Sequence, residues 1–120
     1  MSTHATVIEK KQDQYRSIYV HFDGYVEGLG ETLHEYWNDS ESISEMIDLG
    51  DASSIGSDLD HCEFYGRDRG EADTGPQVCD DINQALDSYN DYRYLWDGDK
   101  WHVYVDNADP FELETAVADR

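Results

Sequence analysis

Fifty consecutive residues of this chain, from Ser17 to Gly66, include no lysine and no arginine. The full 120 residues hold eight basic side chains against 28 acidic ones, which gives a formal net charge of −20. Folded domains normally mix their charges, because like charges held close together raise the free energy of the compact state. The shortage of positive charge therefore predicts that the negative field is itself the functional property.

Other absences limit the setting of the protein. Two cysteines, Cys62 and Cys79, are too few for a disulfide framework. We therefore expect reduced thiols and a location in the cytoplasm of a bacterial host cell. The sequence does not exclude a single disulfide between the two cysteines. The first residues have neither a basic nor an apolar signal region, so no signal peptide is expected. No apolar run approaches the ~20 residues of a membrane-spanning helix, and we expect no membrane contact.

Sequence motifs for catalysis and for metals are also missing. There is no G-x-S-x-G and no P-loop, and the glycines of 28–30 lack the third glycine of a dinucleotide fingerprint. His61, Cys62, Cys79 and His102 have no zinc-type spacing. His21 near Asp23 fits a structural hydrogen bond better than an acid–base pair. We therefore predict no enzyme, no cofactor and no metal site.

What the chain does contain is typical of a folded domain. Aromatic residues make up 12% of it, as nine Tyr, three Trp and three Phe, which is too many for a disordered acidic tail. The length predicts one domain over residues 1–120, with a radius of gyration of roughly 13–14 Å and a diameter of about 35 Å.

Four segments have a composition typical of β-strands: 5–8, 17–22, 92–96 and 101–105. The segment 61–65 is a fifth candidate. Polar turns at 10–14 and 97–100 predict two hairpins. The predicted fold class is α+β, a four- to five-stranded antiparallel sheet with two to four helices packed on one face.

Helical spacing marks several further segments. A helix is expected over 31–37, and a second over 41–49, with Ser40 as its N-cap and Gly50 as its stop. Asp109 and Pro110 are expected to open a last helix. The segment 76–89 is ambiguous between helix and other structure, although its apolar residues are spaced like a helix face: Val78, Ile82, Ala85, Leu86 and Tyr89.

A family resemblance rests on two groups of residues. The run 15–25, with Gly28-Leu29-Gly30 and Thr32-Leu33 after it, resembles a family of small acidic proteins of phages, prophages and plasmids. The segments 94–98 and 101–104 are similar to the C-terminal hairpin of that family. The resemblance implies an origin on a mobile element. In charge and size the chain also resembles DNA-mimic anti-restriction and anti-CRISPR proteins.

The charge fits mimicry of a nucleic acid. B-DNA carries one charge per ~1.7 Å of axis, so ~20 phosphates span about 34 Å, close to the expected diameter of the domain. We therefore predict a DNA-mimic inhibitor that binds a basic nucleic-acid-binding protein of the host, a CRISPR effector complex or a restriction enzyme, and not nucleic acid itself. The expected contact residues are Glu27, Glu31, Glu35, Asp39, Glu41, Glu45 and Asp48, followed by Asp51, Asp58 and Asp60.

Three other functions stay open from the sequence. The chain could be an antitoxin or adaptor that covers a basic partner protein, an acid-dependent hydrolase, or a halophile-adapted domain whose acidity has no function of its own. Two chains paired as a homodimer would lengthen the DNA duplex that the protein imitates, but no sequence feature requires a homodimer.

Overall fold

The structure is a computed structural model, and it describes residues 3–86, 90–105 and 109–118. Its strands are β1 (Ala5–Lys11), β2 (Gln14–Val20), β3 (Ala52–Ser54), β4 (Glu63–Phe64), β5 (Gln77–Cys79), β6 (Tyr92–Trp96), β7 (Trp101–Val105) and β8 (Phe111–Glu112). Its helices are the π-helix η1 (Val26–Gly30), α1 (Glu31–Tyr36), α2 (Ser40–Asp48), the 3₁₀ helix η2 (Leu59–His61), α3 (Tyr65–Arg69), α4 (Ile82–Leu86) and α5 (Leu113–Ala118).

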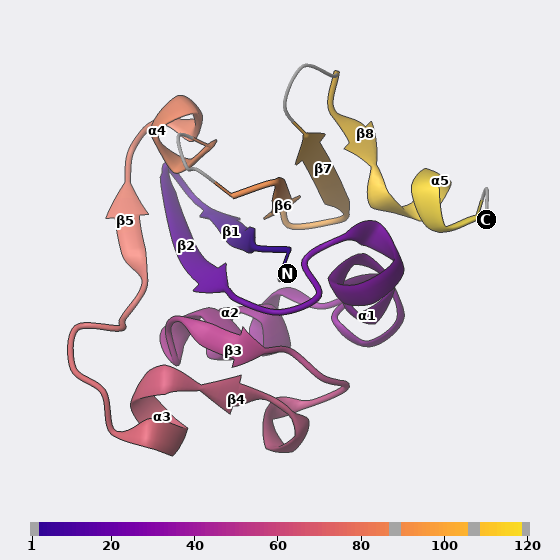
Figure 1. Cartoon of the computed structure of the whole chain (residues 1–120). Coiled ribbons are helices and arrows are strands. Elements are labelled where there is room, and N and C mark those ends of the chain that lie inside the picture. Colours follow the sequence, from indigo (N-terminus) through magenta and orange to yellow (C-terminus); the bar gives the residue numbers. More distant parts are fainter. Residues whose placement is uncertain (1–2, 87–89, 106–108, 119–120) are drawn as a thin grey trace.

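The strands form one mixed sheet in the order β4-β3-β2-β1-β6-β7-β8, and β5 also pairs with β2 (Figure 1). Both predicted hairpins, β1–β2 and β6–β7, are present and antiparallel. The predicted α+β class is confirmed, but the predicted four to five antiparallel strands are wrong. Across the described residues the sheet has eight strands, and β1 pairs with β6, and β2 with β3, in parallel. The extra strands are two or three residues long and too short to produce a periodic pattern.

Strand β1 lies in the middle of the sheet and is covered on both faces. Ala5 and Val7 join the main core with the buried side chains of α1, α2 and α5, whereas Ile8 joins a smaller cluster with Ala85 and Leu95. Because α4 packs on that second face, the prediction that all helices share one face is wrong. Burial on both sides explains why no residue from Ala5 to Glu9 is exposed.

The two helices predicted between 31 and 49 are both present. Helix α2 buries Ile43, Met46 and Ile47 in the main core, as its apolar spacing predicts. Its N-cap is Asp39 and not Ser40: the Asp39 carboxylate accepts a hydrogen bond from the Ser42 amide at 2.8 Å. The Ser40 hydroxyl instead accepts from Trp96 Nε1. Helix α1 is preceded by η1, so helical structure begins five residues earlier than predicted.

The remaining segments differ more from the predictions. The ambiguous segment 76–89 divides into β5 and α4, and Tyr89 lies outside the described residues. Only Glu63–Phe64 of the candidate strand at 61–65 pairs as a strand, because η2 ends at His61 and α3 begins at Tyr65. The last helix begins at Leu113, after β8, and not at Asp109.

The chain folds into a body of 38 × 30 × 29 Å with a radius of gyration of 13.0 Å, in agreement with the predicted size. No helix within the described part of the chain combines the length and the apolar character needed to cross a membrane.

Candidate functional site

Two neighbouring hollows share α1 and the segment 54–60 as walls. The first, of about 380 Å³, lies beside η1 and has Phe22, Leu29 and Ile55 among its lining residues. The second, of about 520 Å³, lies between the end of α1, the start of α2 and η2, and its apolar lining includes Tyr36, Trp37 and Leu59. We call the two hollows together the acidic trough, because carboxylates line both of them.

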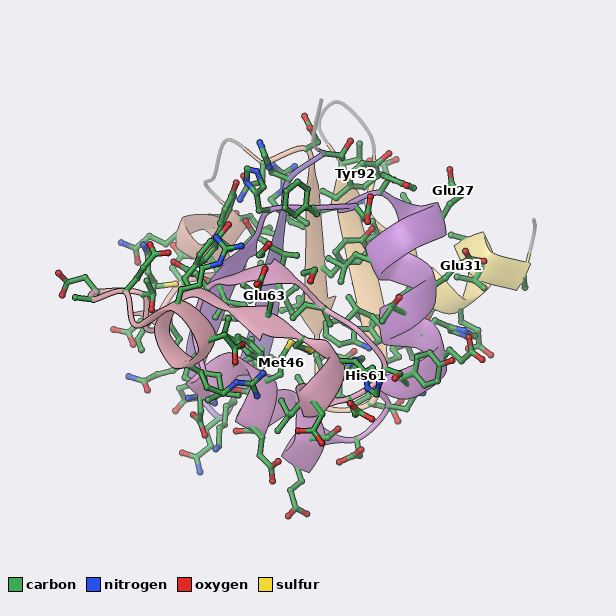
Figure 2. The ribbon with its side chains drawn as sticks, turned by 60° about the horizontal axis from the view of Figure 1, so that its bottom comes forward. Glu27, Glu31, Met46, His61, Glu63 and Tyr92 are labelled. Atoms are coloured by element: carbon green, nitrogen blue, oxygen red, sulfur yellow. The ribbon has the colours of Figure 1, made fainter. Side chains whose placement is uncertain are left out.

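The structure brings seven of the ten predicted contact residues to the acidic trough. The first hollow is lined by Glu27, Glu31 and Glu35, with Asp23 in addition. Figure 2 shows Glu27 and Glu31 projecting outward from η1 and α1. The second hollow is lined by Asp39, Glu45, Asp58 and Asp60. The buried faces of α1 and α2 hold these side chains on a packed base, since Leu33, Ile43 and Ile47 are fully buried beneath them.

The other three predicted residues lie apart from the trough. Glu41 and Asp48 line a hollow between α2 and the tip of the β1–β2 hairpin, which they share with Glu45. Asp51 lies in a third hollow on another part of the surface. It is half-buried and accepts a hydrogen bond from the Tyr19 amide at 2.8 Å, and its burial raises the pKa of the carboxyl group. We conclude that Asp51 has a structural position in the sheet.

Two carboxylates of the trough are held by local hydrogen bonds. The bond from the Ser42 amide lowers the pKa of Asp39. The side-chain hydrogen bond with His61, at 2.6 Å from Nδ1 to Oδ1, lowers the pKa of Asp58 and raises that of His61. Both aspartates are therefore fixed in position and remain ionised at neutral pH.

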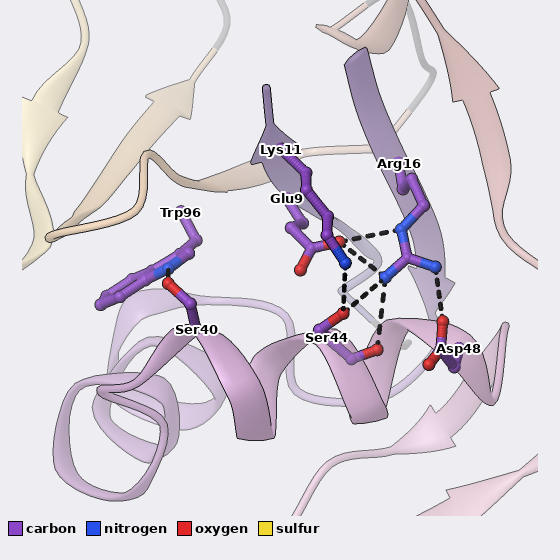
Figure 3. A network of polar contacts seen from close by, with 7 residues as sticks. All are labelled: Glu9, Lys11, Arg16, Ser40, Ser44, Asp48 and Trp96. Atoms are coloured by element: carbon purple, nitrogen blue, oxygen red, sulfur yellow. Dashed lines mark hydrogen bonds and ion pairs between the residues drawn. The ribbon is translucent and has the colours of Figure 1, made fainter. Parts of the chain in front are cut away.

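The Arg16 guanidinium compensates the charge of Asp48 (Figure 3). The Arg16 guanidinium donates to Asp48 and also to Glu9, whose side chain is only 3% exposed. It donates to the hydroxyl of Ser44 as well, at 2.9 Å. Since Glu9 is removed from water, Arg16 serves mainly to neutralise a buried charge.

The acidic trough has few positive charges near it. No described lysine or arginine lines either of its hollows. Arg67 pairs with Asp68, and Arg69 pairs with Glu63. Lys10 and Lys11 lie at the hairpin tip and line the hollow that contains Glu41 and Asp48. The lining of the trough is therefore free of described lysine and arginine, although Arg67 donates to the carbonyl of Leu59 at 2.9 Å and His61 pairs with Asp58.

Exposed carboxylates also occur on other parts of the surface, among them Asp80, Asp91, Asp97, Asp99 and Glu114. The acidity is thus general, and it does not by itself mark one face. What distinguishes the trough is the combination of carboxylates with apolar side chains in a concave surface.

Sequence reasoning missed the apolar side of the trough. It used the aromatic residues as a sign of a folded domain, yet Tyr36 is 51% exposed and Phe22 is 45% exposed. A signal for Tyr36 was available, because it falls outside the buried stripe of Leu29, Leu33 and Trp37 on the same helical segment.

Other candidate chemistry is weak in this structure. Among the described residues there is no group of three or more His, Cys, Asp or Glu side chains placed to hold a metal ion. The His21 ring hydrogen-bonds with the Tyr19 hydroxyl at 2.6 Å, and that hydroxyl also lies 3.0 Å from His4 Nδ1. Cys62 and Cys79 are both free thiols, so the disulfide left open by the sequence is not formed.

Comparisons with known proteins add no assignment. No family model matches the chain, and the searches of curated proteins and of solved structures gave no match. The resemblance to a phage and plasmid family therefore stays a prediction.

Proposed function

We propose that this protein is a DNA-mimic inhibitor, which occupies the nucleic-acid groove of a basic host protein by steric and electrostatic competition. A CRISPR effector complex or a restriction enzyme is the leading class of target, given the resemblance to proteins of mobile elements. The observation that carries the proposal is the acidic trough, in which seven of the predicted carboxylates stand on packed elements with no described lysine or arginine among them.

The dimensions of the molecule support this function. Its longest extent is 38 Å and its formal net charge is −20. A B-DNA segment of that length carries about 22 phosphate charges, at one per ~1.7 Å. A basic groove would therefore meet a similar charge over a similar length. Steering by the field and release of counterions would drive association, and the inhibitor would undergo no turnover.

The direct test is capture of the target from a bacterial lysate on the immobilised protein, followed by elution with duplex DNA and identification of the eluted proteins. We expect nucleic-acid-binding proteins, whose retention falls steeply as salt is raised. A complex that persists at about 1 M salt, where the Debye length is ~3 Å, would exclude electrostatic mimicry as its basis.

A matched pair of triple variants makes this experiment specific for the trough. In the first, Glu27→Gln, Glu35→Gln and Asp60→Asn remove three exposed trough charges. In the second, Glu71→Gln, Asp80→Asn and Asp91→Asn remove three exposed charges that line neither hollow of the trough. We expect the first variant to lose most of the captured protein and the second to lose little. Equal losses would show that only total charge matters.

The apolar lining of the trough favours a second candidate, an adaptor or antitoxin that covers a basic protein. Exposed Tyr36 and Phe22 suit a protein partner, and phosphate mimicry does not require them. Captured proteins that lack a nucleic-acid groove, and that duplex DNA fails to displace, would support this candidate and exclude the mimic.

A further inference from the structure

We propose that the ring of Tyr36 receives an arginine side chain of the partner, so that this contact adds stacking to the electrostatic attraction of the trough. The inference rests on the proposed function, because it names the chemical group by which the basic partner is held. It identifies the second hollow, bounded by α1, α2 and η2, as the place of that contact.

The chain itself contains two examples of the arrangement. The Arg67 guanidinium lies over the Phe64 ring at 4.9 Å, and the same side chain pairs with Asp68 at 3.0 Å. Arg69 lies over the Tyr65 ring, also at 4.9 Å, and pairs with Glu63 at 2.7 Å. In both cases an aromatic face and a carboxylate together hold one arginine at the surface.

The second hollow has the same two components without the arginine. Tyr36 is 51% exposed, and the hollow is also lined by four carboxylates, those of Asp39, Glu45, Asp58 and Asp60. No described lysine or arginine lines this hollow. An exposed ring among carboxylates is complementary in charge and shape to a guanidinium, which the aromatic face and the carboxylates can contact at the same time.

Arginine fits this surface better than lysine does. Its planar guanidinium stacks on an aromatic ring, forms paired hydrogen bonds with carboxylates and is more weakly hydrated than an ammonium group. The apolar stem of the arginine would lie along Leu59, which also lines the hollow. We therefore expect the trough to prefer arginine-rich segments over lysine-rich segments of equal charge.

The test measures the dissociation constants of fluorescein-labelled nona-arginine and nona-lysine by anisotropy at several salt concentrations. The wild-type chain is expected to bind nona-arginine more tightly. Tyr36→Ala should weaken nona-arginine binding by about three- to tenfold, with a smaller effect on nona-lysine. The slope of log Kd against log salt concentration should stay the same, because no charge is removed.

Three further variants control for side-chain size, folding and position. Tyr36→Phe keeps an aromatic face and should bind like the wild-type chain. Tyr36→Leu keeps apolar bulk without the ring and should lose the arginine preference, which preserves the test if the alanine variant folds poorly. Val78→Ala changes an exposed apolar residue of β5 outside the trough and should have no effect.

The inference is overturned if Tyr36→Ala and Tyr36→Leu bind nona-arginine like the wild-type chain, or if they weaken both peptides equally. The triple variant Glu27→Gln, Glu35→Gln and Asp60→Asn separates this outcome from failure of the proposed function. If that variant loses affinity for both peptides while Tyr36 has no effect, the arginine contact alone is wrong. If it binds both peptides unchanged, the electrostatic function is wrong.

Discussion

At the scale of single residues, Arg16 shows how the chain uses its few cations. Its guanidinium joins a carboxylate at the centre of the sheet, that of Glu9, to one at the end of α2, that of Asp48. Bringing an ionised carboxylate into the interior is unfavourable unless a partner charge and hydrogen bonds accompany it. This arginine is therefore a requirement of the fold in a protein that has only eight basic side chains.

We predict that Arg16→Met lowers the free energy of unfolding by about 3 kcal/mol, because the carboxylate of Glu9 is then left buried without its partner. Adding Glu9→Gln to this variant should restore part of the loss, since the uncompensated charge is removed. Urea denaturation followed by tryptophan fluorescence measures both effects. Lys100→Met breaks the exposed pair with Glu112 and should cost much less. Similar losses in the two single variants would contradict this explanation.

The site residues themselves were only partly predictable. The carboxylates of Glu27, Glu31 and Glu35 could be placed on one surface from their helical spacing alone. The position of Asp51 could not, because its hydrogen bond with the Tyr19 amide joins residues 32 positions apart. The second hollow of the trough also depends on tertiary structure, since η2 approaches α1 and α2 only in the folded chain.

At the scale of elements, the end of α2 depends on Gly50. This residue has a φ of +87°, and a Cβ atom there would lie 2.0 Å from the carbonyl oxygen of Thr74. That carbonyl accepts a hydrogen bond from the Asp51 amide at 2.7 Å, so it is held in place. The junction between α2 and β3 therefore requires both the left-handed conformation and the absence of a side chain.

We predict that Gly50→Ala lowers the free energy of unfolding by more than about 2 kcal/mol, since it adds a backbone clash to the strain of a positive φ. Gly70 is the matched control: it has a φ of +68°, and a methyl group added there would meet no atom within 4 Å, so Gly70→Ala should cost about 1 kcal/mol. Thermal unfolding of both variants, followed by circular dichroism, measures the difference. Equal losses of stability in the two variants would mean that the clash with the Thr74 carbonyl does not contribute to the free energy of unfolding.

Long elements were predicted well and short ones poorly. The stripe of Ile43, Met46 and Ile47 placed α2, and the two hairpins were visible in strand composition and turn residues. Val78 was grouped with a helix face, but it lies in β5 and is 56% exposed. The parallel pairing of β1 with β6 joins segments more than 80 residues apart along the chain, and the local pattern of neither strand indicates its partner.

At the scale of the whole molecule, the net charge of −20 opposes the compact state. Raising NaCl from about 0.01 M to 1 M shortens the Debye length from ~30 Å to ~3 Å, which removes most repulsion across a body of this size. We predict that the unfolding temperature rises over this range. Scanning calorimetry measures this temperature. The unfolding temperature of the triple variant Glu27→Gln, Glu35→Gln and Asp60→Asn should rise less with salt. A temperature independent of salt would mean that the carboxylates do not interact appreciably.

The border strands of the sheet in the described chain, β4, β5 and β8, are only two or three residues long. Such short borders give another chain almost no unpaired backbone along which to add. In concentrated salt, where mutual repulsion between molecules no longer keeps them apart, fibril growth by strand addition should therefore remain slow. The architecture thus protects the protein from aggregation under conditions in which its charge does not.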